Sequence, residues 1–478
     1  MNYRIILHTL GWVLNIEAVA MLLPLICSLC YAEWNMAKIF LVCIAICLVF
    51  GLALTKKTLT KKTMYAKEGF ICVGLSWIVL SIFGSLPFIF SGTASVVDSL
   101  FETASGFTTT GASIFTDVEA LPKGLLFWRS FTHWLGGMGV LVFLVALLPL
   151  AGGNNMQLIK AESPGPSVSK LVPKVRSTAK ILYLMYLGLT LIQTIFLLLG
   201  GLNLFESLTL TFGTAGTGGF AIWSSSCGHL SPYIQWVITI FMVLFGVNFS
   251  LYYLLLLGKI RDVIKSEELR TYLGIIIVAI TVIVLNCKDM FQNIGEAIRH
   301  TSFQVSSIIT TTGFATTDFD LWPSLSKAIL VLLMFIGASA GSTGGGIKVS
   351  RIIILFKSIK KEIFSTTHPN ASKKITLDGR MVEHNVVRGT NAFLAAYVVI
   401  FAISTLVICI DNFDLVTNFT AVAATINNIG PGLSMVGPTQ NYSVFSDFST
   451  LVLTADMIIG RLEIFPFLVL FAPSTWRK

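Results

Sequence analysis

Long apolar runs alternate with short polar or basic stretches along almost the whole chain of 478 residues. A helix that spans a lipid bilayer needs about 20 mostly apolar residues, and the runs predict about ten such helices. Two of them come first, near 10–31 and 37–54. The others form four pairs. The first helices of the pairs are expected near 70–90, 180–200, 272–286 and 391–410, and the second helices near 125–149, 233–257, 326–356 and 447–471.

Between the two helices of each pair lies a segment too short and too polar to span, followed by a glycine-containing string. The short segments are 97–105, 203–212, 294–309 and 414–426, and the strings are 108–111, 217–221, 310–315 and 427–432. Irregular backbone at membrane depth is tolerated only where it is buried in protein or lines a water-filled cavity. The pattern therefore predicts an all-α membrane protein with two N-terminal helices and four repeated units around one central pore. Each unit consists of a helix, a pore helix, a filter loop and a second helix.

The glycine strings carry the candidate chemistry. Glycine allows the positive φ that turns backbone carbonyls toward an axis. Four such loops at the negative ends of short helices could replace the hydration shell of one K⁺ ion. The predicted filter and K⁺-binding residues are Thr110, Gly111, Thr217, Gly218, Gly219, Thr312, Gly313, Asn428, Ile429 and Gly430. In the second unit Gly218 and Gly219 compete for the key position, and Gly219 is preferred because 219–221 matches 313–315.

Composition and charge agree with a membrane protein. The mean hydropathy is +0.81, and only 12% of the residues are charged against 54% hydrophobic, which excludes a single soluble domain. The net charge of +9 resides mainly in loops at 55–69, 160–180, 258–270 and 357–388, so it does not indicate a nucleic-acid partner. These loops fall on one side, which predicts that this side and both termini are cytoplasmic. The opposite side is expected to form an acidic mouth of Asp98, Glu102, Asp117, Glu119, Glu206, Asp318, Asp320, Asp411, Asp414 and Asp447.

The second helix of the third unit is interrupted by five glycines between 337 and 346. Each glycine costs about 1 kcal/mol relative to alanine in a helix, so the segment is predicted to unwind below the filter as a flexible gate. The alternative is a helix-packing face of small residues, but such faces space their small residues a turn apart. The gate candidates are Gly341, Gly344, Gly345, Gly346, Lys348 and Arg461. Lys348 is expected nearer the cytoplasmic face, and the alternative to a gate role is a lysine whose side chain reaches the water at that face.

Arg461 lies inside the last apolar run, and an intramembrane charge is by default a functional candidate. Carbonyls of the glycine-rich segment, Glu463 and Asp456 are its possible partners. The alternative is an arginine that snorkels to the interface, which its expected depth of about ten residues from the helix end disfavours.

Residues typical of catalysis do not form a recognisable constellation. His133 lies on a spanning helix and is expected to be a packing histidine. Most of the eight cysteines lie in apolar runs. The sequence does not decide whether Cys227 and Cys287, both expected near the outer face, form a disulfide. The chain is therefore predicted not to be an enzyme. An intramembrane enzyme using Arg461 and His133 is a remote alternative, and a proton- or sodium-coupled potassium symporter is a closer one.

Several segments together resemble the Trk/Ktr/HKT superfamily of potassium transporters, most closely its TrkH-type membrane subunit. They are 128–139, 161–166, 341–348, 427–432 and 472–477, in addition to the four filter strings. The resemblance implies potassium uptake across the plasma (inner) membrane of a prokaryotic-type cell, with K⁺ in the filter and no covalently bound cofactor. It also implies a homodimer in lipid with a cytosolic nucleotide-binding regulatory subunit of the TrkA type.

Mapped by this resemblance, the filter glycines are Gly111, Gly219, Gly313 and Gly430, the gate loop runs from 337 to 346, and the gate arginine is Arg461. Gly111 keeps the glycine that sodium-permeable plant relatives replace with serine, which favours potassium. The chain is divided into two N-terminal helices at 1–69 and pore units at 70–159, 160–258, 259–389 and 390–478.

Overall fold

The computed structural model describes residues 2–56, 64–139, 175–369 and 374–476. The predicted motif at 161–166, most of the basic loop at 160–180, the unit boundary at 159 and the end of the helix expected at 125–149 lie outside the described residues. So do Lys57, Lys61, Lys62, Lys373 and Arg477.

Six helical stretches are long and apolar enough to cross a membrane, judged by length and composition. They are α1–α2 (Tyr3–Ala20 and Leu22–Cys30), α3 (Trp34–Thr55), α4–α5 (Ala66–Gly84 and Leu86–Ser91), α10 (Val175–Leu199), α15 (Glu267–Cys287) and α19 (His384–Ile408). These are the two N-terminal helices and the first helix of each predicted unit. The chain is thus a helical, multi-span membrane protein, as its hydropathy predicted.

The second helices differ from the continuous spans expected near 233–257 and 447–471. Helices α12 (Pro232–Phe245) and α13 (Phe249–Leu256) meet at a bend of 91°. Helix α21 (Asp447–Arg461) is separated from α22 (Phe465–Phe471) by Glu463 and Ile464, whose φ angles of 54° and 70° are incompatible with an α-helix. Helices α17 (Ser324–Ile336) and α18 (Val349–Thr367) flank the glycine-rich segment, and α7 (Lys123–Gly137) ends shortly before Gly139.

Four short helices begin at side-chain caps and end near one another. They are α6 (Val96–Phe107), α11 (Leu204–Ala215), α16 (Ile294–Ile309) and α20 (Leu415–Ile426). Their N-caps are Ser95, Asn203, Asn293 and Asp414, and each cap side chain accepts a hydrogen bond from the backbone N–H three residues later. These residue types at these positions fix where each short helix starts, between the two helices of its unit.

The remaining described elements are small. They are α14 (Ile260–Lys265), α23 (Pro473–Trp476), the strand pair β1 (Thr376–Leu377) and β2 (Arg380–Met381), and the 3-10 turns Lys288–Met290, Phe319–Leu321, Cys409–Asp411, Ser434–Val436 and Tyr442–Val444. All eight cysteines are free, so Cys227 and Cys287 are not bridged.

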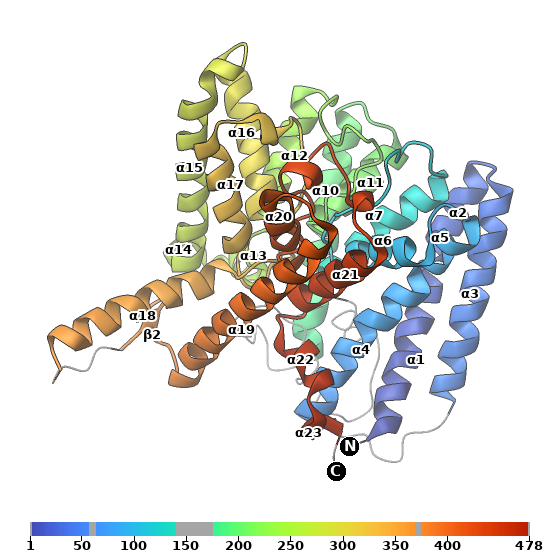
Figure 1. The fold of residues 1–478 in the computed structure, drawn as a ribbon, viewed down its shortest axis with the longest axis horizontal. Helices are drawn as coiled ribbons and strands as arrows, with labels where there is room; N and C mark the ends of the chain where they lie inside the picture. The colour runs from blue at the N-terminus through green and yellow to red at the C-terminus, as the bar shows by residue number, and fades with distance from the viewer. Residues whose placement is uncertain (1, 57–63, 140–174, 370–373, 477–478) are drawn as a thin grey trace.

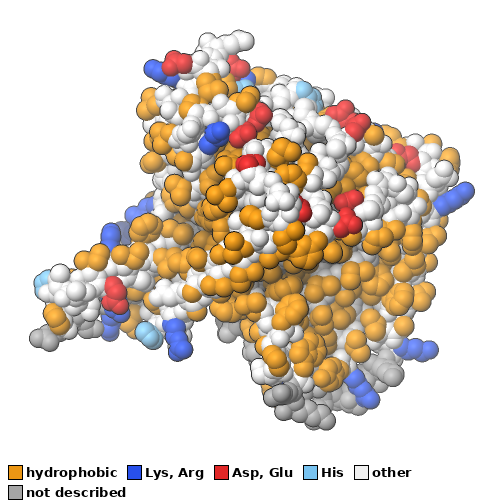
Figure 2. All heavy atoms as spheres, viewed as in Figure 1, with side chains coloured by type: hydrophobic (Ala, Val, Ile, Leu, Met, Phe, Trp, Pro, Cys, Tyr) orange, Lys and Arg blue, Asp and Glu red, His pale blue; other side chains and the backbone are white. Residues whose placement is uncertain are grey.

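Figure 1 shows α6, α7, α11, α20 and α21 near the middle of the molecule, α1 and α3 on the right, and α15–α17 at the upper left. Helices α18 and α19 extend to the lower left, and α1 begins near α23 at the lower edge. A broad apolar band crosses the face in Figure 2, and the acidic side chains on this face lie mostly above it. This is the surface expected of a protein surrounded by lipid.

Candidate functional site

The four glycine strings share one backbone conformation. We define loop 1 as 108–111, loop 2 as 216–219, loop 3 as 310–313 and loop 4 as 427–430. The second residue of each loop has a positive φ: 57° at Thr109, 54° at Thr217, 60° at Thr311 and 56° at Asn428. The fourth residue is a glycine with positive φ: 80° at Gly111, 79° at Gly219, 85° at Gly313 and 99° at Gly430. The shared pattern places Gly219, not Gly218, in register with the other three glycines.

Each short helix enters its loop through a Schellman motif, the arrangement in which two backbone N–H groups fold back onto the last helical carbonyls. The bond that spans five residues joins Thr110 N to Ser105 O at 2.9 Å in loop 1. Its counterparts join Gly218 N to Gly213 O, Thr312 N to Ser307 O and Ile429 N to Ala424 O at 2.8 Å each. Glycine usually occupies the left-handed position of this motif, whereas three loops here have threonine. Backbone strain of this kind clusters at functional sites.

The four glycines form a closed ring with the neighbouring carbonyls. A Cβ atom built on Gly111 would lie 1.9 Å from the oxygen of Gly218, one on Gly219 1.9 Å from that of Thr312, one on Gly313 2.0 Å from that of Ile429, and one on Gly430 2.8 Å from that of Thr110. The contacts run from loop 1 through loops 2, 3 and 4 and back to loop 1. A side chain would collide with backbone at each of these positions, so the ring requires glycine.

Hydrogen bonds connect adjacent loops outside the ring. Asn428 Nδ2 donates to Thr110 Oγ1 at 2.9 Å. Tyr442 donates from its hydroxyl to Gly430 O of loop 4 at 2.7 Å and from its backbone N–H to Ser113 O, two residues after loop 1, at 2.8 Å. Between loops 2 and 3, the Cys227 N–H donates to Ala315 O at 2.9 Å. These bonds are made by neutral groups and fix the loops against one another.

His133 connects the first two units. Its Nε2 accepts from the Phe220 N–H at 3.2 Å, and Nδ1 therefore carries the proton and donates to Gly106 O at 2.8 Å. The buried ring is fully hydrogen-bonded, as expected for a packing histidine.

One member of the expected acidic mouth lies elsewhere. Glu102 is buried on α6, where it pairs with Arg129 of α7 at 2.7 Å, so its prediction as a mouth residue was wrong. The other nine acidic residues are exposed or half-exposed. Sequence reasoning gave Arg129 no role of its own, although a lone arginine inside an apolar run was a usable signal.

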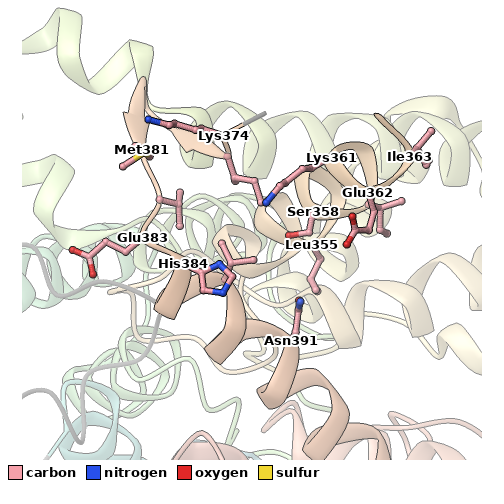
Figure 3. A pocket seen from close by; sticks show the side chains of 14 residues that line it. Leu355, Ser358, Lys361, Glu362, Ile363, Lys374, Met381, Glu383, His384 and Asn391 are labelled. Atoms are coloured by element: carbon pink, nitrogen blue, oxygen red, sulfur yellow. The ribbon is translucent and has the colours of Figure 1, made fainter. Parts of the chain in front are cut away.

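Two cavities differ in their relation to the ring. A small one, of about 120 Å³, is lined by Gly111, Gly219, Gly313 and Gly430 together with polar side chains of the outer loops. We call it the vestibule. A larger one, of about 630 Å³, lies among α18, the β1–β2 hairpin and α19, where Figure 3 shows Lys361, Glu362 and His384. None of the predicted filter or gate residues lines the larger cavity.

The glycine-rich segment 337–348, which we call the unit-3 loop, packs directly against the ends of the short helices. The Gly345 N–H donates to Thr311 Oγ1 at 2.6 Å. A Cβ atom on Gly345 would lie 2.4 Å from Asn427 O, and one on Gly344 would lie 2.8 Å from Thr310 O. The consecutive glycines therefore permit a backbone-to-backbone approach beneath loops 3 and 4.

Charged side chains hold the unit-3 loop. Lys348, a gate candidate, is buried and its Nζ donates to Gly344 O, so the alternative of an ordinary exposed lysine does not hold. Glu268, at the start of α15, accepts from the Ala340 N–H at 2.7 Å. Sequence analysis missed Glu268, since an acidic residue in the first turn of a helix usually only stabilises that turn.

Arg461, in unit 4, contacts backbone carbonyls of units 3 and 1. Its Nη1 donates to Thr343 O at 2.9 Å, and its Nη2 donates to Gly136 O at 2.5 Å and to Gly137 O at 2.9 Å. It therefore contacts a carbonyl of the unit-3 loop, one of the three partners considered. Arg461 also ends α21, so it does not lie ten residues inside a continuous helix as expected.

The other two candidate partners are engaged elsewhere. Glu463 pairs with Arg351, and Asp456 accepts from the Ser404 hydroxyl at 2.7 Å.

This fold and site define a multi-span membrane protein in which four short helices direct glycine loops into one ring. The chain belongs to the TrkH family, described as "Cation transport protein", whose family model matches residues 35–478. It is 36% identical to the "Trk system potassium uptake protein TrkH" of Escherichia coli K12, over all of both chains. It is 32% identical to TrkG of the same organism, over 100% of this chain and 99% of that one. The crystal structure of the potassium transporter TrkH from Vibrio parahaemolyticus matches over both complete chains, with 33% identity and a TM-score of 0.89.

Proposed function

We propose that this protein takes up K⁺ across the membrane through the ring of four glycine loops. The observation that carries the proposal is the cyclic contact of each ring glycine with the carbonyl of the next loop. Four like backbones around one point can present carbonyl oxygens to a dehydrated cation. The relatives' names as potassium uptake proteins support the choice of K⁺.

The ring supplies the selectivity filter. The carbonyls of Thr110, Gly218, Thr312 and Ile429 each lie beside the ring glycine of the preceding loop, and the loop residues Thr217 and Asn428 have the positive φ of the strained turns. The four short helices direct their C-terminal ends, which carry partial negative charge, toward the ring. The vestibule above it then receives cations from the outer side.

The unit-3 loop closes the path below the filter. It lies against loops 3 and 4, and Lys348 and Arg461 bring positive charge to it. A fixed positive charge in a cation path raises the barrier to entry, and the arginine donors hold the loop in place. Opening requires that these contacts be broken.

We also propose a location and an assembly, which the membership of the family and the charge distribution support. The protein functions in the plasma (inner) membrane with both termini in the cytoplasm, and it assembles as a homodimer with a nucleotide-binding TrkA-type subunit. The end of the molecule formed by α18, the β1–β2 hairpin and the start of α19 carries many of the described basic residues that are expected in the cytoplasm. It is therefore the side available to a cytosolic regulator.

The decisive test is tracer flux with the purified protein in liposomes. With a K⁺ gradient and no gradient of H⁺ or Na⁺, rubidium should accumulate in proteoliposomes according to the K⁺ gradient. If rubidium accumulates only when an H⁺ or Na⁺ gradient is imposed, the protein is a coupled symporter and not a pore. No flux of rubidium under either condition would refute potassium transport.

A further inference from the structure

A buried ion pair lies beside the first two loops. Arg129 Nε donates to Glu102 Oε1 at 2.7 Å, and the two side chains are 2% and 0% exposed. Burial of two opposite charges is costly unless each is also satisfied by hydrogen bonds. The surroundings meet that requirement.

The pair fastens the segments that follow loop 1 and loop 2. Glu102 accepts from Ser113 Oγ at 3.1 Å and from the Ile114 N–H at 3.0 Å. Arg129 donates from Nη1 to Ala221 O at 3.1 Å and from Nη2 to Ser113 Oγ at 3.2 Å. Ser113 lies two residues after Gly111, and Ala221 lies two residues after Gly219. The guanidinium fork therefore spans the joint between two adjacent filter loops.

The guanidinium is also close to the cation path. Arg129 lines the vestibule together with the ring glycines, and its Cζ lies 4.0 Å from the centre of the Phe220 ring. A positive charge at this wall would repel an approaching cation. The carboxylate of Glu102 neutralises it at contact distance.

We propose that Arg129 and Glu102 are a positioning pair that determines the cation specificity of the ring. Arg129 fixes the separation of loops 1 and 2, and Glu102 cancels the charge that this fixation brings to the vestibule. The inference rests on the proposed potassium pathway. It assigns two different tasks to two residues in contact, and conservative substitutions can separate them.

Arg129→Lys tests the fixation. Lysine keeps the positive charge but lacks the rigid fork, so it cannot hold Glu102, Ser113 and Ala221 together. The selectivity for rubidium over sodium in proteoliposomes should fall by about tenfold, while the maximal rubidium rate stays within about twofold of the unaltered protein. Arg299→Lys, the same exchange on α16, is the matched control and should change neither quantity.

Glu102→Gln tests the neutralisation. The amide keeps the size and one acceptor oxygen but loses the charge, so the guanidinium becomes a net positive charge beside the path. The rubidium uptake rate at low cation concentration should fall by about tenfold. Glu362→Gln, the same exchange at an exposed position of α18 outside the mouth, the ring and the unit-3 loop, is the matched control and should leave the rate nearly unchanged.

The double variant Arg129→Gln/Glu102→Gln removes both charges. It should recover most of the rate lost in Glu102→Gln and keep the low selectivity of Arg129→Lys. Unchanged selectivity in Arg129→Lys, or a double variant that is as slow as Glu102→Gln, would overturn the pair's proposed roles. Normal elution on gel filtration verifies folding, and if Arg129→Lys does not fold the double variant decides. Absence of rubidium flux in the unaltered protein would instead refute the proposed function.

Discussion

The ring of glycine loops and the unit-3 loop are both irregular, glycine-rich backbone at the centre of the molecule, yet they are held in different ways. The ring repeats one Schellman-type turn four times, and loops 4 and 1 are joined by a hydrogen bond from Asn428 to Thr110. The unit-3 loop has no repeated turn. Backbone hydrogen bonds join it to the end of α12 and to α13, as from Ser339 N to Gly246 O and from Phe249 N to Gly341 O, and side chains of distant elements, among them Arg461 and Glu268, bind it as well. The ring is thus closed by the same turn in every unit, whereas the unit-3 loop is held by contacts that differ along its length.

Breaking the ring should have the largest effect. In Gly111→Ser, the new Cβ would lie 1.9 Å from the carbonyl oxygen of Gly218, so loops 1 and 2 must separate. We expect the permeability ratio of potassium to sodium to fall by at least about tenfold, since the ligand ring loses its shape. Ion flux measured with both cations in proteoliposomes gives this ratio.

Gly92→Ser is the matched control for that substitution. Gly92 also has a positive φ, of 70°, but a Cβ there meets no atom within 4 Å. The control carries the same backbone strain without the collision and should keep the native permeability ratio. Equal ratios in Gly111→Ser and the unaltered protein would remove Gly111 from the filter.

Releasing the unit-3 loop should give the next largest effect. Arg461→Ala removes the donors to Thr343 O and to the end of α7, and it removes a positive charge from the path. Basal rubidium flux without a regulatory subunit should rise by about tenfold, as expected if about 1.4 kcal/mol of barrier is lost. Arg388→Ala, at an exposed position of α19, serves as the charge control. A lower flux at normal expression would contradict the gate.

Shortening the loop within 341–346 should raise basal flux by a similar factor, because the backbone no longer reaches loops 3 and 4. If the loop and Arg461 form one barrier, the combination with Arg461→Ala should add little to either change alone. The flux of the four proteins in this cycle measures the coupling. Multiplying effects would show two separate barriers.

Glu268→Ala should have the smallest effect. It removes one hydrogen bond to the loop, at Ala340, and leaves the contacts of Arg461 and Lys348 intact. A buried hydrogen bond contributes about 1 kcal/mol, so we expect basal flux to rise by only about threefold to fivefold. Glu268→Gln keeps an acceptor for the Ala340 N–H and should stay closer to the unaltered protein. A decrease of flux in Glu268→Ala would mean that this anchor holds the loop open.

The sequence predicted those features that depend on local composition. Apolar runs of membrane length gave the six long helices, and cap residues such as Asn203 and Asp414 preceded the short helices. The positions of the glycine strings were also visible, because threonine–glycine turns recur between apolar runs. The sequence analysis did not predict that α21 ends at Arg461, although Pro466, in the first turn of α22, was a usable signal for a new helix start after the break at Glu463 and Ile464.

The tertiary structure decided which distant groups meet. Glu102 looks like one more acidic residue of the outer surface until α7 places Arg129 beside it. From the sequence Lys348 could reach the cytoplasmic face, but in the structure its side chain binds Gly344 O. Arg461 has three candidate partners in the sequence, and the structure shows that it binds Thr343 O of the unit-3 loop. The physical reason is that hydropathy and turn propensity act over a few neighbouring residues. Charge pairing and the closing of the ring depend on contacts between segments up to about three hundred residues apart, such as Asn428 and Thr110.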